Sequence, residues 1–170
     1  MEILMRRRDR EVTDLGEIVA IIGRCEVLHL GLVDDGKPYI VPLNYGFEEK
    51  DGQITLVFHS AQEGRKIDII KRNPSACFEL SRIHKIIRGE KPAGWTARYE
   101  SVIGYGDVEI IENVAEKTAA MDLIMKKHGY EGVPEYAPQA IDETAICKLT
   151  VSEITAKRNM KPEDLRESNA

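Results

Sequence analysis

Apolar and polar residues alternate along most of this chain, and this alternation predicts a mainly β protein. The pairs Asp35-Gly36 and Asp51-Gly52 separate the first three alternating runs and predict tight hairpin turns. Six strands linked largely by hairpins predict an antiparallel sheet that closes into a small barrel, because closure removes exposed edges. The six strands are expected at 27–33, 37–47, 53–59, 75–80, 95–111 and 144–157.

Three segments have the 3.6-residue period of amphipathic helices, and each begins with a capping signature. They follow Asp14, Ser60 and Asn113, each with a Glu three residues later. The signature at Ser60 predicts a helix that starts directly after this residue and continues to Arg72. Too few helices separate the strands for a parallel, doubly wound sheet.

Several interruptions of the pattern have structural meaning. Pro42 lies inside the second strand, so that strand is expected at an edge or at a bulge. Gly104 and Gly106 predict bends in a long strand. Residues 82–94 are basic and aperiodic and predict a mobile loop, and residues 130–143 form a second loop.

Length and composition indicate one globular domain. The 170 residues are 42% apolar and 31% charged, which predicts a domain at 1–158 and a polar tail at 159–170. A net charge of -5 gives no basic footprint for nucleic acid. The isolated Cys25, Cys77 and Cys147 indicate neither disulfides nor a metal site. No membrane span or export signal is expected, so the protein is predicted to be cytoplasmic.

The junction between the third strand and its helix has the features of an anion site. A helix N-terminus carries free N–H groups and partial positive charge, and Arg65 and Lys66 lie on its first turns. Their side chains lean toward the N-terminus and can meet a phosphate there. The alternative is an ordinary surface helix with solvated basic residues.

Five ordered motifs resemble those of the nitroimidazole-resistance (Nim) proteins, a group of pyridoxamine 5'-phosphate oxidase-like FMN-binding split barrels. The resemblance extends to about residue 157 and implies a six-stranded antiparallel split β-barrel with flanking helices. It also implies a homodimer that binds FMN at the subunit interface. The motifs are Met5–Glu11, His29–Val33, Pro38–Gly46, Phe58–Lys66 and Tyr99–Gly106.

The same resemblance assigns residues to the cofactor. The flavin phosphate is expected at Ser60, Arg65 and Lys66, where strand meets helix. The basic Arg6–Arg10 arm either covers the cofactor or is disordered. Residues 99–102 would approach from the partner subunit. The cofactor set is Val41, Pro42, Leu43, Asn44, Phe58, His59, Ser60, Gly64, Arg65, Lys66, Tyr99, Ser101 and Val102.

His59 is the candidate catalytic residue. Strand alternation places Phe58 toward the barrel and His59 on the opposite face, where the resemblance makes it a candidate for substrate contact or proton supply. A histidine has an ordinary pKa of about 6.5 and can donate a proton near neutral pH. The alternative is a structural histidine. His29 is expected in the core, and His84 and His128 at the surface.

The resulting hypothesis is an FMN-dependent oxidoreductase that reduces small nitroaromatic or related acceptors with electrons from NAD(P)H. One alternative is a pyridoxamine 5'-phosphate oxidase-like oxidase, which needs a basic substrate site such as Arg88, Lys91 and Arg98. The other is a non-catalytic flavin- or haem-binding protein, in which a histidine would ligate iron.

Overall fold

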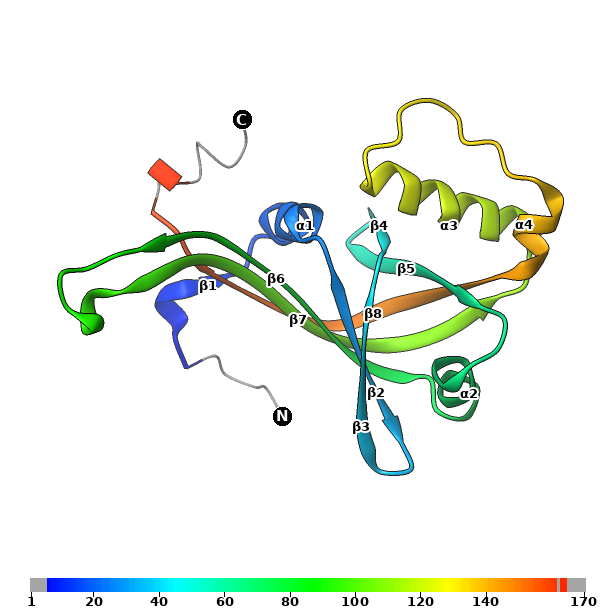
Figure 1. Cartoon of the computed structure of the whole chain (residues 1–170), viewed down its shortest axis with the longest axis horizontal. Helices are drawn as coiled ribbons and strands as arrows, with labels where there is room; N and C mark the ends of the chain where they lie inside the picture. Colours follow the sequence, from blue (N-terminus) through cyan, green and yellow to red (C-terminus); the bar gives the residue numbers. More distant parts are fainter. Residues whose placement is uncertain (1–5, 162, 165–170) are drawn as a thin grey trace.

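The fold is one antiparallel sheet with helices at its sides, seen here in a computed structural model that describes residues 6–161 and 163–164 (Figure 1). The strands follow the order β3-β2-β6-β7-β8-β5-β4, and β1 pairs with β8. This confirms the prediction of a mainly β, antiparallel protein. The strands are β1 (Glu11–Val12), β2 (Leu28–Asp34), β3 (Lys37–Leu43), β4 (Gly46–Lys50), β5 (Gln53–Ala61), β6 (Ser75–Ile87), β7 (Thr96–Ile111) and β8 (Thr144–Asn159).

Two of the predicted helix caps are confirmed. The Asp14 side chain accepts a hydrogen bond from the Glu17 amide at 2.9 Å, and Asn113 accepts one from the Glu116 amide at 3.1 Å. Among the residues described, no helix is both long and apolar enough to cross a membrane. The helices are α1 (Leu15–Arg24), α2 (Arg65–Arg72), α3 (Val114–Lys127) and α4 (Pro138–Glu143), with 3₁₀ turns η1 (Arg8–Arg10) and η2 (Pro92–Gly94).

Both predicted hairpin turns are confirmed by their backbone angles. Asp35 and Gly36 have φ of 49° and 79°, and Asp51 and Gly52 have φ of 52° and 86°. Positive φ at two consecutive turn residues is the geometry that Asp-Gly favours in two-residue hairpins. These turns fix the register of β2 with β3 and of β4 with β5.

The expected number of strands and the expected closure are not what the structure shows. Within the described residues the sheet has eight strands and is open, because β3 and β4 are its two ends. The predicted strand 37–47 breaks after Leu43, where Tyr45 turns into the core. The Tyr45 hydroxyl donates to the carbonyls of Ile22 and Cys25, at 2.6 and 2.8 Å. These bonds tie the break to the end of α1.

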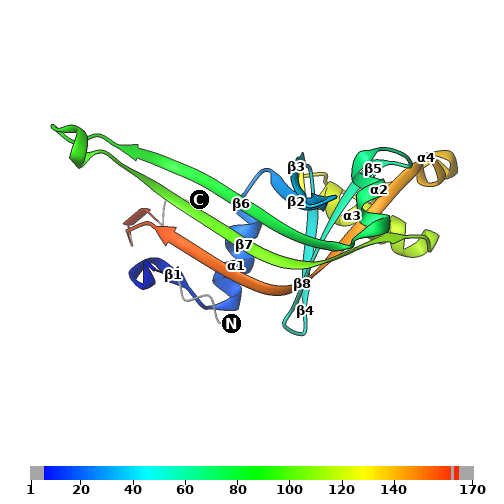
Figure 2. The same ribbon diagram turned by 90° about the horizontal axis from the view of Figure 1, so that it is seen from below.

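The predicted loop at 82–94 is wrong for its first six residues, which are strand, and its last three residues form the turn η2. β6 continues to Ile87 and pairs with β7 as far as Thr96, with one irregularity between Ile83 and Lys85. The hairpin projects from the body of the protein as a long arm (Figures 1 and 2). Both faces of this hairpin are in contact with solvent, so both carry polar and basic residues. The alternation of apolar and polar residues that predicts a strand is therefore absent there. The segment 130–143 likewise contains α4, which its sequence did not signal.

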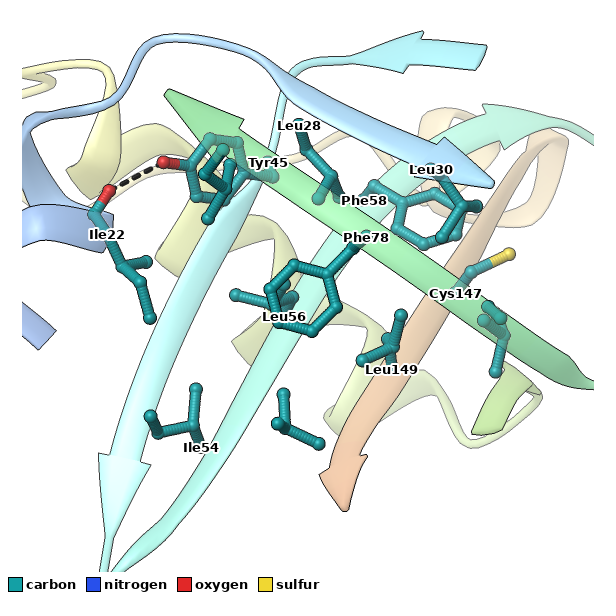
Figure 3. Packing of buried hydrophobic residues seen from close by; sticks show 14 of the residues in the cluster. Ile22, Leu28, Leu30, Tyr45, Ile54, Leu56, Phe58, Phe78, Cys147 and Leu149 are labelled. Atoms are coloured by element: carbon teal, nitrogen blue, oxygen red, sulfur yellow. Dashed lines mark hydrogen bonds between the residues drawn. The ribbon is translucent and has the colours of Figure 1, made fainter. Parts of the chain in front are cut away.

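The core lies on the inner face of the curved sheet (Figure 3). Phe58 and Phe78 meet there with Leu30 and Leu56, and all four are 0–1% exposed. A second, smaller cluster lies under α3, on the outer face of β5, β7 and β8, and consists of Val57, Ile111, Ala120, Ile124 and Ile146. β5 is therefore covered on both faces over its middle part.

Candidate functional site

The junction of β5 and α2 differs from its prediction in one respect. β5 extends to Ala61, since Ser60 and Ala61 pair with Ala145 and Thr144 of β8. α2 begins only at Arg65, with Gly64 as its N-cap at φ 133°, and no side chain caps this end. The predicted Ser60–Glu63 capping box is therefore wrong. The first-turn N–H groups of α2 have no helical acceptor and remain available for an anion.

Arg65 is held in place by two neighbours, Asp34 and Tyr39. Its Nε donates to Asp34 Oδ2 at 2.8 Å, and its guanidinium carbon lies 4.6 Å from the centre of the Tyr39 ring. Arg72 donates to the other oxygen of Asp34 at 2.6 Å. The hydrogen bond from Arg65 is the main reason that the pKa of Asp34 is lowered. Two arginines thus share one carboxylate, so this group of three side chains carries a net positive charge.

Lys66 supplies a second positive charge in a less polar setting. Its side chain is half-buried, and burial lowers its pKa. No carboxylate of the described residues forms an ion pair with it. Burial raises the pKa of the Cys147 thiol to about 11, and the positive charge of Lys66 acts in the opposite direction and lowers it. An incompletely hydrated ammonium without a counter-ion, next to a free helix N-terminus, favours a bound anion.

The predicted flavin-ring residues lie at a free sheet edge. Val41 and Leu43 are half-buried and pair with Leu30 and Leu28, whereas Pro42 and Asn44 are exposed. The β2–β3 register is continuous, so Pro42 marks an edge strand and not a bulge. Half of the backbone polar groups of an edge strand point away from the sheet and can bind a ligand.

His59 lies on the opposite side of β5 from Phe58, as alternation predicts, and faces α3. Phe58 is 0% exposed in the core, and Ser60 shares its face of the strand. The imidazole therefore does not face Lys66 within one chain. It borders a pocket of about 220 Å³ whose other walls are Met121, Ile124, Met125, Tyr136 and Thr144.

Tyr99, Ser101 and Val102 lie in the first half of β7, where β8 begins to pair with this strand. The Tyr99 hydroxyl accepts a hydrogen bond from Arg10 at 3.2 Å, which connects the basic N-terminal segment to β7. Val102 points the other way and is 0% exposed. The approach of Tyr99 and Ser101 to the cofactor from a partner subunit stays a prediction.

Two histidine predictions are wrong. His29 is a surface residue, because its side chain is 43% exposed and lies 2.9 Å from Glu79. His84 is not at the surface, since only 11% of its side chain is exposed and its Nε2 lies 2.8 Å from Glu100. His128 is exposed at the end of α3, as predicted.

Glu100 is the centre of a buried charge cluster that the sequence reasoning missed. It is 0% exposed and accepts hydrogen bonds from Arg24 and Arg158, at distances between 2.7 and 2.9 Å. The partners come from α1 and β8, far apart in the chain, so only the fold reveals them. No group of three or more His, Cys, Asp or Glu within the described part of the chain is placed to hold a metal ion.

Comparison with known proteins gives a consistent result. Residues 14–158 match the pyridoxamine 5'-phosphate oxidase family. A crystal structure from Bacteroides thetaiotaomicron, provisionally named a 5-nitroimidazole antibiotic resistance protein, is 33% identical, with a TM-score of 0.75 over 86% of this chain and 85% of that chain. The flavocytochrome Anf3 from Azotobacter vinelandii is 18% identical, with a TM-score of 0.75 over 96% and 78% of the two chains.

A third structure, the FAD and haem binding protein from Mycobacterium smegmatis, is 16% identical, with a TM-score of 0.74 over 93% of this chain and 80% of that chain. Because these identities are below 20%, the last two structures show only that this chain shares their fold. No curated protein sequence matches.

Proposed function

Because the chain belongs to the pyridoxamine 5'-phosphate oxidase family, we propose that it is an FMN-dependent oxidoreductase that reduces small nitroaromatic or related molecules. The observation that carries the proposal is the arrangement at the start of α2. There, Arg65 and Lys66 are the first two residues of a helix whose N-terminus has no side-chain cap. A phosphate monoester carries two negative charges and several acceptor oxygens, which is the chemistry that such a donor set matches.

The residues present fit the phosphate of a flavin mononucleotide. Asp34 engages the Nε of Arg65 and orients the guanidinium, whose remaining N–H groups stay available. Lys66 gains a counter-ion for its half-buried ammonium group. Ser60, on the same face of β5 as the core, supplies a hydroxyl at the strand end. These residues would hold the phosphate.

The flavin ring would lie along the free edge of β3. Val41 to Asn44 offer backbone groups there, and Pro42 cannot itself donate one. Tyr99 and Ser101 would come from a partner subunit, so the proposed active unit is a homodimer. Val102 would contribute only through its backbone, since its side chain is in the core.

FMN, when bound, supplies the electron transfer, and the protein supplies binding, orientation and protons. The exposed His59 has no hydrogen bond to another described residue, whereas His29 and His84 are bonded to Glu79 and Glu100. The exposed His128 has no side-chain hydrogen bond to a described residue either, but only His59 borders a pocket, so His59 is the histidine proposed to give a proton to a substrate oxygen. Similarity to the Bacteroides protein supports a nitroaromatic substrate, and NAD(P)H is the proposed reductant.

The structure weakens the support for one alternative. Arg98, a candidate for the substrate phosphate of an oxidase, lies 2.9 Å from Asp164. Arg88 lies over Trp95 at the tip of the arm, 5.8 Å from the ring centre. Within residues 6–161, no contact brings Arg88 or Arg98 together with Lys91 to form a phosphate site.

The absorbance spectrum of the purified protein tests the cofactor. The wild type is expected to bind FMN, and the double variant Arg65→Ala/Lys66→Ala to lose it. Arg88→Ala/Lys91→Ala is the matched control, because it removes the same charge from the arm. A wild type that binds no FMN, or a double variant that binds it as well as the control does, would refute the phosphate site. A Soret band after haem titration would favour the haem-binding alternative.

A further inference from the structure

A second concave site lies on the other side of α2 from the β2–β3 hairpin. It is a groove of about 660 Å³ between α2, the last residues of β7 and the start of α3. Its floor is apolar and includes Ile67, Ile70, Val108 and Ile110. The volume is within the range of small-molecule sites in proteins. Arg65 and Lys66 do not line this groove, so it is distinct from the proposed flavin phosphate site.

Lys117 gives the groove a specific chemistry. It is the charged wall residue on α3 and is only 7% exposed. Its ammonium group donates to the backbone carbonyl of Ile141, and no carboxylate of the described residues lies within ion-pair distance. An ammonium group taken out of water needs a charged partner to offset the loss of hydration. A neutral carbonyl meets that need only in part.

The other charges around the groove leave room for an anion. Glu109 is neutralised by Lys148, at 2.6 Å. The remaining charged residues that line the groove are two lysines, Lys71 and Lys117, and one carboxylate, Glu112. The local balance is positive, and its most buried member is Lys117.

We propose that this groove binds a small amphipathic anion, with its carboxylate at Lys117 and its apolar body on Ile67 and Ile110. The inference does not depend on the flavin, because it rests on a buried ammonium group beside an apolar surface. A short-chain or aromatic carboxylate has the required combination of charge and apolar area. Inorganic phosphate has the charge without the apolar body, and an alcohol of the same length has the body without the charge.

Isothermal titration calorimetry with octanoate, octan-1-ol and inorganic phosphate tests this assignment. Octanoate is expected to bind the wild type at least about tenfold more tightly than octanol does, as for a hydrogen-bonded charge. Lys117→Met is expected to remove that advantage, because it keeps the chain length and loses the charge. Lys126→Met, on an exposed position of the same helix, is the control and should bind octanoate as the wild type does.

A second variant covers the case in which Lys117→Met does not fold, since Lys117 also supports α4. Ile110→Trp fills the groove and leaves Lys117 in place, and it is expected to abolish octanoate binding in a protein with an unchanged melting curve. The proposal is overturned if octanoate does not bind the wild type, if octanol or phosphate binds equally well, or if a folded Lys117→Met or Ile110→Trp protein keeps the wild-type affinity.

Discussion

The guanidinium group of Arg65 lies over the ring of Tyr39, with 4.6 Å between its central carbon and the ring centre. The two residues belong to α2 and β3, and this contact connects the proposed phosphate site with the proposed ring site. Asp34 fixes the same guanidinium by a hydrogen bond from its Nε. Arg65 is therefore oriented before any ligand arrives, and this lowers the entropy cost of binding.

Tyr39→Leu is expected to weaken FMN binding by about two- to fivefold, because an exposed cation–π contact contributes about 0.5–1 kcal/mol. Tyr39→Phe keeps the ring and should bind as the wild type does. Quenching of FMN fluorescence measures both dissociation constants. Equal affinity of the Leu and Phe variants would show that the ring has no such role.

The stability contributed by Asp34 should depend on pH. Its pKa is lowered in the folded state, first by the hydrogen bond from Arg65. The contribution is then complete above the ordinary carboxyl pKa of about 3.9 and is lost as pH falls through the lower, folded value. In urea unfolding, the difference in stability between the wild type and Asp34→Asn should be constant from neutral pH down to about pH 5 and shrink in stronger acid. A difference that grows on acidification would contradict this.

The sequence predicted those parts of the fold that local chemistry determines. Asp14 and Asn113 are caps, and Asp35-Gly36 is a turn, because each depends on neighbours within three residues. Ser60 has the same capping pattern as Asp14 and does not cap. Pairing of Ala61 with Thr144 holds that segment in the sheet, and this long-range contact overrides the local signal.

The same reasoning explains what was missed at the site. Arg65 and Lys66 could be proposed from the sequence because a basic pair near the start of a helix is a local feature, although α2 begins later than its predicted cap. The contacts of Arg65 with Asp34 and Tyr39 cross from α2 to the β2–β3 hairpin, and no spacing announces them. The charge cluster at Glu100 also depends on tertiary contacts, since it joins segments more than fifty positions apart.

Glu100→Gln is expected to destabilise the protein by about 3–5 kcal/mol, because it leaves Arg24 and Arg158 near one another without their buried carboxylate. The unfolding free energy in urea measures the loss. Glu109→Gln is the control, since Glu109 is 61% exposed in its pair with Lys148 and should cost no more than about 1 kcal/mol. Similar losses in both variants would mean that the buried cluster is no more important than a surface ion pair.

Gly104→Ala is expected to cost about 1–3 kcal/mol through overpacking. A Cβ atom at this position would lie 2.5 Å from the ring of Phe78 and 2.7 Å from the carbonyl oxygen of Glu153. Gly23→Ala in α1 is the matched control, because its Cβ would meet Phe47 at an ordinary 3.4 Å and alanine favours the helix. Thermal unfolding should rank Gly104→Ala below the wild type and Gly23→Ala at or above it.

His59→Ala should separate the two roles that this histidine can have. As a proton donor it would contribute about 10²–10⁴-fold to the rate, so the variant should retain FMN and lose turnover with a nitroaromatic substrate. His128→Ala, at the exposed end of α3, is the control and should keep the wild-type rate.

A merely structural His59 would give a different result. The pocket beside it is lined by Met121, Met125 and Tyr136, and the Tyr136 hydroxyl donates to Asp122 at 2.9 Å. The loss of a packing group there should lower the melting temperature and leave the pH dependence of the rate unchanged. The loss of a proton donor should remove that pH dependence at an unchanged melting temperature. Steady-state rates across pH, measured beside thermal melts of the same samples, distinguish the two, and an unchanged rate would exclude His59 from the mechanism.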